Sequence, residues 1–168
     1  GAYAPTHTHF SHFPPISDKV YYIIGVMRAK FPVTVHLLFF RAEQVLLLLR
    51  CNTGYRDREY SVPAGHLDGN ETVMAAAVRE AEEETGLRLD SSNLAFSSVM
   101  HRNEGEERVD FFIHVRAWEG EPVNAEPEKC TELMWVNVEN LPANTIPYVR
   151  RAIENHRQGM RFDEFGWE

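Results

Sequence analysis

The sequence predicts an α/β or α+β layered domain, because strand-sized apolar runs lie before, between and after two helical segments. Two further observations support one such domain. The chain has the length of a single domain, 168 residues, and 43% of them are hydrophobic, which is enough for a core at this size. Charged residues make up 25% of the chain, as in an ordinary globular protein rather than a disordered one.

Residues 1–17 are expected to form an N-terminal leader or tag-like arm, followed by a single domain over residues 18–168. This first stretch contains prolines, aromatic residues and three histidines, and it carries no charge before Asp18. The histidine spacing is also compatible with a metal-binding arm. Residues 19–27 are apolar and fit either a strand or a short helix.

The sequence lacks the features of a membrane or secreted protein. No apolar run approaches the ~18 residues that a membrane helix needs, and no basic region followed by an apolar core marks a signal peptide. Cys51 and Cys130 form neither a disulfide framework nor a metal pair at useful spacing. We therefore expect a cytoplasmic protein with free thiols and no membrane partner.

The first half of the chain predicts three strands. Residues 33–40 and 45–50 are almost continuously hydrophobic, which indicates strands covered on both faces. The polar residues 41–44 have the length of a hairpin turn between them. Residues 59–62 read as a short strand that is stopped by Pro63–Gly65.

Residues 70–86 form the clearest predicted helix. Asn70 is a suitable N-cap, Glu71 favours the first turn, and Gly86 is a natural C-terminal stop. At about 100° per residue, one arc of this helix is apolar and is expected to face the core. It consists of Met74, Ala77, Val78, Ala81 and Thr85.

The second half predicts two long strands over residues 94–101 and 108–118, with a hairpin loop between them. A last strand covers residues 133–136, after a polar loop with two prolines. Residues 147–158 are predicted to be a helix that begins with a proline, and the aromatic tail after it is expected to fold back on the domain.

The chain is acidic, with 17 basic and 25 acidic residues and a formal net charge of −8. Such a balance argues against an extended nucleic-acid track or an anionic membrane surface, which both need Lys and Arg. The excess is local, however. Residues 65–87 contain six acidic residues and one basic residue, a net of −5. The charge is therefore weaker evidence against a small polyphosphate substrate than it first suggests.

Three glutamates on the predicted helix, Glu80, Glu83 and Glu84, share one arc because spacings of three and four bring side chains together. Like charges at this spacing repel each other, and they lie in the last turns, where the helix dipole favours cations. A solvated acidic face would explain the run, but a bound Mg²⁺ or Mn²⁺ would remove the repulsion. Glu82 points away from this arc.

The segment from Gly65 to Leu87 resembles a known motif. Gly65 is followed after five residues by Glu71, and Glu71 after seven residues by Arg79-Glu80-Ala81-Glu82-Glu83-Glu84-Thr85-Gly86-Leu87. This is similar to an intact Nudix box, and all seven of its fixed positions match. Ala81 is smaller than the usual aliphatic residue at its position, which should affect packing more than chemistry. Similarity to MutT-like Nudix hydrolases extends over roughly residues 30 to 160.

This resemblance implies a fold, a cofactor and a set of site residues. The fold would be an α/β/α sandwich with a mixed β-sheet between helices. Members of the family cleave a nucleoside diphosphate derivative at its pyrophosphate with Mg²⁺, for which Mn²⁺ may substitute. The implied metal ligands are the Gly65 carbonyl, Glu80, Glu83 and Glu84. Glu71 and Arg79 would orient the site, and Glu83 or Glu84 would act as the general base, with Glu126 and Glu128 as candidates outside the box.

The substrate is the least specified part of the prediction. A nucleoside triphosphate, in oxidised form or not, is favoured over a nucleotide sugar or dinucleotide, and a non-catalytic nucleotide-sensing module is the alternative in another class. Asn144 lies where some MutT-like members place a base-reading residue, although a loop cap explains it equally well. Arg50, Arg56 and Arg58 suit either phosphate binding or a charged surface. The oligomeric state is not encoded in a recognisable way.

Overall fold

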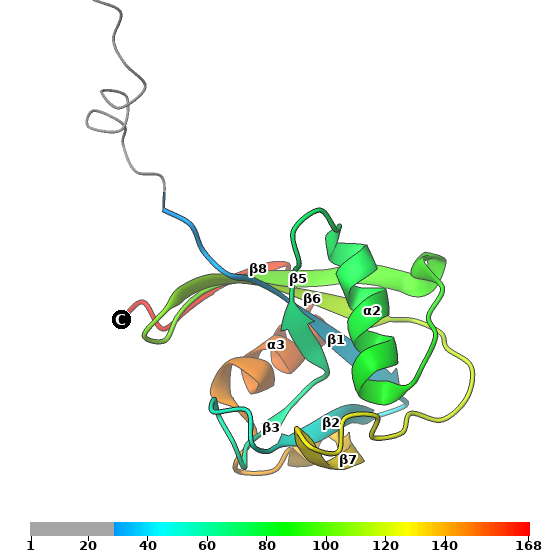
Figure 1. The fold of residues 1–168 in the computed structure, drawn as a ribbon. Helices are drawn as coiled ribbons and strands as arrows, with labels where there is room; N and C mark the ends of the chain where they lie inside the picture. The colour runs from blue at the N-terminus through cyan, green and yellow to red at the C-terminus, as the bar shows by residue number, and fades with distance from the viewer. Residues whose placement is uncertain (1–28) are drawn as a thin grey trace, which may run out of the picture. The chain divides into compact units, whose positions relative to one another are not determined.

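The computed structural model describes residues 29–168, of which residues 31–168 form one compact unit (Figure 1). The predicted arm over residues 1–17 and the apolar segment 19–27 lie outside the described residues. The boundary at residue 18 therefore stays a prediction. Among the described residues, no helix is both long and apolar enough to cross a membrane.

The described elements are mostly strands. The strands are β1 (Val33–Arg41), β2 (Gln44–Arg50), β3 (Tyr60–Ser61), β4 (Ala64–His66), β5 (Leu94–Asn103), β6 (Glu107–Val115), β7 (Cys130–Asn137) and β8 (Phe162–Phe165). The helices are α2 (Val73–Thr85) and α3 (Pro147–Gln158), with short 3₁₀ turns η1 (Ser91–Asn93) and η2 (Val138–Asn140).

The strands form a mixed sheet in the order β3-β2-β1-β6-β5-β8, to which β4 adds beside β1 and β7 beside β2. The pairs β1–β6 and β5–β8 are parallel, and the other pairs are antiparallel. Strands β1 and β2 share only the pairs nearest their turn, Phe40↔Val45 and Arg41↔Gln44. Beyond them β1 pairs with β4, whereas β2 pairs with β3 and β7.

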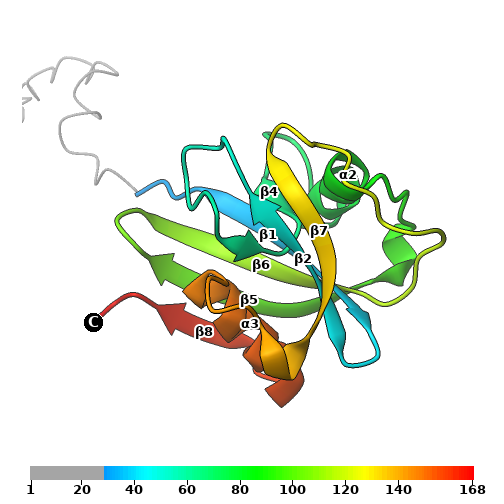
Figure 2. The same ribbon diagram turned by 90° about the horizontal axis from the view of Figure 1, so that it is seen from below.

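The two helices cover opposite faces of this sheet, as Figures 1 and 2 show. Side chains of β1 alternate between the two faces because the side-chain period of a strand is two. One set packs with α2 in a core that includes Val35, Leu37, Phe39, Ala76, Ala77 and Ala81. The other set packs with α3 in a core that includes Leu38, Phe112, Val149, Ala152 and Ile153. The predicted α/β/α sandwich with a mixed sheet is confirmed.

One detail of the predicted box helix is wrong. Its N-cap is Thr72, whose Oγ1 accepts a hydrogen bond from the Ala75 N–H at 3.1 Å, and not Asn70. Asn70 has a φ of 68° and lies in the turn before the helix. The predicted apolar arc does face the core: three of its members are buried, and Met74 and Val78 are half-buried against the same cluster. Ala76 and Glu80 are buried as well.

A charged pair is buried between the sheet and α3. Arg102 and Asp110 are 2% and 0% exposed, and Arg102 Nε donates to Asp110 Oδ2 at 2.6 Å. The guanidinium also lies 3.8 Å from the centre of the Tyr148 ring. Burial acts to raise the pKa of Asp110, but the neighbouring His36 imidazole and the hydrogen bond from Arg102 lower it to about 2. The pair therefore stays ionised in the core.

We expect Arg102→Met to lower the free energy of unfolding by about 3–5 kcal/mol, because it leaves the Asp110 carboxylate buried without its strongest partner. Arg88→Met is the matched control, since Arg88 is 87% exposed and, among residues 29–168, pairs only with Glu82. Its effect should stay within about 0.5 kcal/mol. Urea unfolding followed by circular dichroism measures both, and equal losses in the two variants would contradict the assignment.

Candidate metal and active site

Strand β4 and helix α2 bring the two ends of the box together. Gly65 pairs with Val35 in β1, and α2 packs on both β1 and β4. The Glu80 carboxylate consequently lies directly against the Gly65 backbone. A Cβ at residue 65 would stand 1.8 Å from Glu80 Oε1, which no structure can accommodate without moving that carboxylate. Glycine is required here by a close approach and not by an unusual φ.

Arg79 connects the carboxylates of the box. Its guanidinium donates to Glu71 at 2.7 and 3.2 Å, to Glu80 Oε1 at 2.5 Å and to Glu83 Oε2 at 3.2 Å. It also donates to the His66 carbonyl at 3.0 Å. These bonds tie the loop before α2 to the helix itself. Hydrogen bonds from Arg79 and from the Asp68 N–H lower the pKa of Glu71 below its usual range.

Glu84 is a half-buried carboxylate of the box. The Ala64 N–H donates to its Oε2 at 2.8 Å, which fixes the side chain against β4. Burial raises the pKa of Glu84 to about 8, the Ala64 N–H opposes the shift, and the neighbouring Glu80 and Glu126 add to it. Burial also raises the pKa of Glu80, against the lowering influence of Arg79.

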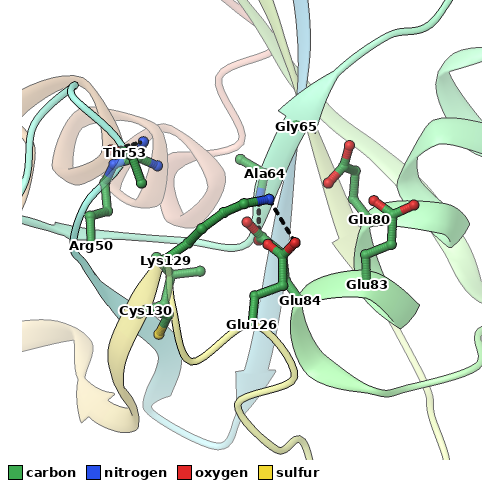
Figure 3. A pocket seen from close by; sticks show the side chains of 11 residues that line it. Arg50, Thr53, Ala64, Gly65, Glu80, Glu83, Glu84, Glu126, Lys129 and Cys130 are labelled. Carbon is green, nitrogen blue, oxygen red and sulfur yellow. Dashed lines mark hydrogen bonds and ion pairs between the residues drawn. The ribbon is translucent and has the colours of Figure 1, made fainter.

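Glu80, Glu83 and Glu84 open into one cavity of about 280 Å³ between the sheet and α2 (Figure 3). Residues from three other parts of the chain complete its wall. The lining is Leu48, Arg50, Thr53, Ala64, Gly65, Glu80, Glu83, Glu84, Glu126, Lys129 and Cys130. Glu71 and Arg79 do not line this cavity and contact it only through the carboxylates that Arg79 holds.

A fourth carboxylate comes from the loop before β7. The loop is attached to the end of α2, where the Val123 and Ala125 N–H groups donate to the Thr85 and Glu84 carbonyls at 3.0 and 3.2 Å. This attachment places Glu126 in the cavity. Of the two glutamates that the sequence offered outside the box, Glu126 is therefore the one at the cavity, and Glu128 is not in its lining. The box motif cannot indicate this residue, since a separate loop carries it.

The opposite wall of the cavity is cationic. Arg50 donates from Nε to the Tyr55 carbonyl at 3.0 Å and from its terminal nitrogen to Thr53 Oγ1 at 3.0 Å, so its guanidinium is held in place. Lys129 extends into the cavity from the loop side, where Figure 3 shows it reaching toward Glu126. The cavity thus combines four carboxylates with a fixed guanidinium and an ammonium group.

The other residues considered for substrate binding lie outside this cavity. The Asn144 side chain is exposed and donates to the Arg58 carbonyl at 2.8 Å, which is the loop-capping arrangement. Arg56 pairs with Glu59 and Glu104 at 3.2 and 2.8 Å. A role of Asn144 in reading a base therefore remains a prediction, because the described contacts give it a structural partner only.

The carboxylate and carbonyl oxygens of the cavity fit a hard divalent cation, although Arg79 and Lys129 are bonded to several of these carboxylates. Carboxylate and carbonyl oxygens are the ligands that Mg²⁺ and Mn²⁺ favour, and the Gly65–Glu80 contact is too close for any side chain at residue 65. Among residues 29–168, however, no three acidic, His or Cys side chains already stand as a complete ion site. Glu80 and Glu83 are bonded to Arg79, and Glu126 to Lys129.

A mixed sheet between two helices, with a glycine–helix segment that gathers carboxylates in one cavity, defines a protein of the Nudix class. Residues 30–156 match the family described as NUDIX domain. The chain therefore belongs to this family, and within it to the MutT-like hydrolases.

Individual relatives are distant. The chain is 27% identical to a MutT NUDIX hydrolase of Burkholderia pseudomallei, whose crystal structure it matches with a TM-score of 0.70 over 76% of this chain and 98% of that one. It is 23% identical over 124 residues to the 8-oxo-dGTP diphosphatase of Escherichia coli, covering 73% of this chain and 95% of that protein. A putative nudix hydrolase 1 of Caenorhabditis elegans is 31% identical over 61% of this chain, which spans only 27% of that relative's length.

The raised pKa of Glu84 predicts a pH-dependent stability of the metal-free protein. Folded Glu84 keeps its proton up to about pH 8, whereas the unfolded carboxyl loses it near 4.5. The folded state therefore binds more protons between these values, and the free energy of unfolding should fall as the pH rises, by about 1.4 kcal/mol per pH unit at most. Glu84→Gln should remove this component.

Melting temperatures of wild type and Glu84→Gln, measured between pH 5 and 8.5 in the presence of a chelator, test the expectation. The difference between the two proteins isolates Glu84 from the other titrating groups, including the histidines. The variant should gain stability relative to wild type as the pH rises. Parallel curves would show that Glu84 is already ionised in the folded protein.

Proposed function

We propose that this chain is a Mg²⁺-dependent hydrolase that cleaves the pyrophosphate linkage of a nucleoside diphosphate derivative, foremost a nucleoside triphosphate, in oxidised form or not. One observation carries the proposal: Glu80, Glu83, Glu84 and Glu126 converge with Gly65 on a single cavity whose other wall holds Arg50. A polyanionic pyrophosphate can enter so acidic a site only together with cations. Mn²⁺ should replace Mg²⁺, because both favour oxygen ligands.

The relatives support a small nucleotide as the substrate. The Escherichia coli protein with 23% identity is named for the hydrolysis of 8-oxo-dGTP. Another relative, 29% identical over 119 residues, is the phosphatase NudJ of the same organism. A small, soluble substrate also agrees with a cytoplasmic location, which we propose together with the activity.

Glu80, Glu83, Glu84 and the Gly65 carbonyl would hold the cation, and Glu126 is placed to join them. A bound divalent cation supplies Lewis-acid polarisation of phosphoryl oxygens and lowers the pKa of water in its shell. Arg79 and Glu71 act as positioning residues, since Arg79 bonds the cavity carboxylates, Glu71 bonds Arg79, and neither lines the cavity. Without these bonds, neighbouring carboxylates on α2 would repel each other into different rotamers.

Side chains of the cavity would bind the phosphate and accept the proton during hydrolysis. Arg50 is preorganised by Thr53 and the Tyr55 carbonyl and suits a phosphate oxygen. Glu83 or Glu84 accepts the proton of the attacking water as its oxygen bonds to phosphorus. The bridging P–O bond then breaks, and the leaving phosphate takes the electron pair.

The activity predicts a sharp contrast between two adjacent glutamates. Glu83→Gln should lower turnover of the best nucleotide by about 100- to 10,000-fold, because it removes a ligand or the general base. Glu82→Gln should leave it unchanged, since Glu82 is exposed and its one charged partner in the described part of the chain is Arg88. Release of phosphate or nucleoside monophosphate from a nucleotide panel, with Mg²⁺ or a chelator, measures both.

The same panel separates the alternatives. Preferential turnover of nucleotide sugars or dinucleotides would replace nucleoside triphosphates as the proposed substrate class, but the assignment of the site residues would stay the same. Nucleotide binding by wild type without turnover would favour a sensing module instead. Equal turnover by wild type and Glu83→Gln would show that this carboxylate has no part in the reaction.

A second prediction concerns the close approach at Gly65. Gly65→Ala should reduce activity by about 100-fold, because the new methyl group displaces the Glu80 carboxylate. Stability should change by no more than about 1 kcal/mol, since only the end of a flexible side chain has to move. Gly69→Ala is the matched control, because a Cβ there meets no atom within 4 Å.

Kinetic assays with the nucleotide panel and thermal melts distinguish the two glycines. We expect Gly69→Ala to keep both activity and melting temperature. A fully active Gly65→Ala protein would show that the position of Glu80 against residue 65 is irrelevant to catalysis.

A further inference from the structure

We propose that Lys129 is an internal counter-ion of the carboxylate cavity, whose ammonium group competes with a divalent cation for Glu126 and the neighbouring Glu84. The inference rests on the proposed function, because it presupposes that the cavity binds such a cation. Its consequence is a site of moderate cation affinity, in which cation binding releases the Lys129 ammonium group from the carboxylates into water.

The contact that carries the inference lies within the cavity. Lys129 Nζ stands 2.7 Å from Glu126 Oε1, and both residues are in the cavity lining. Figure 3 shows the long side chain crossing the opening between the β7 side and Glu84. The carboxyls of Glu126, Glu84 and Glu128 raise the pKa of Lys129, so the ammonium stays charged at neutral pH.

The backbone of Lys129 is fixed, which confines the exchange to its side chain. The Lys129 carbonyl accepts from the Cys51 N–H at 2.8 Å, and the Lys129 N–H donates to the Glu126 carbonyl at 2.9 Å. The tight turn over residues 126–129 therefore holds the two partners next to each other. The four-carbon stem of lysine can still swing the charge away without any change in the loop.

Lys129 is better suited to release than Arg79, the other cation bonded to the cavity carboxylates. Arg79 donates to three glutamates and to the His66 carbonyl, so its departure would break several charge-assisted bonds. Lys129 has one carboxylate partner and is 56% exposed, compared with 28% for Arg79. Moving its ammonium into water therefore carries little desolvation cost.

The size of the effect follows from the exposure of the pair. A solvent-exposed ion pair contributes only weakly, so removing the lysine charge should tighten cation binding by about two- to fivefold. The effect should shrink as salt is added, because screening weakens the competition between two charges for one carboxylate. If Lys129 were only a solvated surface residue, removing its charge would leave the cation affinity unchanged.

Calorimetric titration of the nucleotide-free protein with MnCl₂ and MgCl₂ tests the proposal. We expect Lys129→Met to bind about two- to fivefold more tightly than wild type. Lys129→Arg should match wild type because it retains the charge. Arg157→Gln, which removes a positive charge on α3 that is paired with Glu139 of η2, is the control for net charge and should also match wild type.

The outcomes separate this inference from the proposed function. Cation binding by wild type without a gain in Lys129→Met, or with a gain of the same size in Arg157→Gln, would overturn the counter-ion role alone. Failure of every folded variant to bind either cation would overturn the proposed metal site itself, and this inference with it. Circular dichroism and melting temperatures verify that the variants are folded.

A second readout follows the ammonium group directly. Lys19, Lys30 and Lys129 are the lysines of the chain, so reductive ¹³C-methylation gives a simple lysine spectrum, in which Lys129→Arg assigns the resonance of interest. That resonance should move on addition of Mg²⁺ with the midpoint found by calorimetry, while the other two lysines stay unchanged. A Lys129 resonance that does not respond at saturating Mg²⁺ would contradict its displacement.

Discussion

The site depends on the guanidinium of Arg79, which bonds Glu80 and Glu83 of α2 and also Glu71 in the loop before it. Glu80 and Glu83 repel each other at their spacing of three residues, and they lie in the C-terminal half of the helix, where the dipole opposes negative charge. The structure offsets this cost locally with a single cation bonded to all three. The bond from Arg79 to the His66 carbonyl then links the helix to the end of β4, so that the loop between them has little freedom.

The geometry of the cavity follows from how β4 is held. Its pairing with β1 places Gly65 beneath Glu80 and turns the Ala64 N–H toward Glu84. The divergence of β1 and β2 beyond their shared turn leaves room for β4 at this point. From the far end of α2, the carbonyls of the last turn hold the loop that supplies Glu126. Strand β4 and the loop that carries Glu126 are thus attached to the same helix.

The acidic residues of the cavity are partly neutralised by cations of the protein itself. Four glutamates share the cavity, but Arg79 and Lys129 already neutralise part of their charge through direct bonds. These two cations differ in their contacts and exposure. Arg79 has several hydrogen bonds and is partly buried, whereas Lys129 bonds one carboxylate and is mostly exposed to water. Such a site holds its carboxylates in their orientation before any ligand binds. In our proposal, the Lys129 ammonium group is then free to exchange with a divalent cation.

The sequence alone determined the layered fold and the box. Hydrophobic period set strands such as β1, the same period with the stop at Gly86 set helix α2, and the fixed spacing from Gly65 to Leu87 identified the family, because local rules and motif spacing need no knowledge of distant contacts. Tertiary structure decided the rest. The burial of Glu80, the selection of Glu126 over Glu128 and the cationic wall of Arg50 and Lys129 depend on packing between segments far apart in the chain. No periodicity within one segment can report such packing, since it is set by how sheet, helix and loop are held against each other.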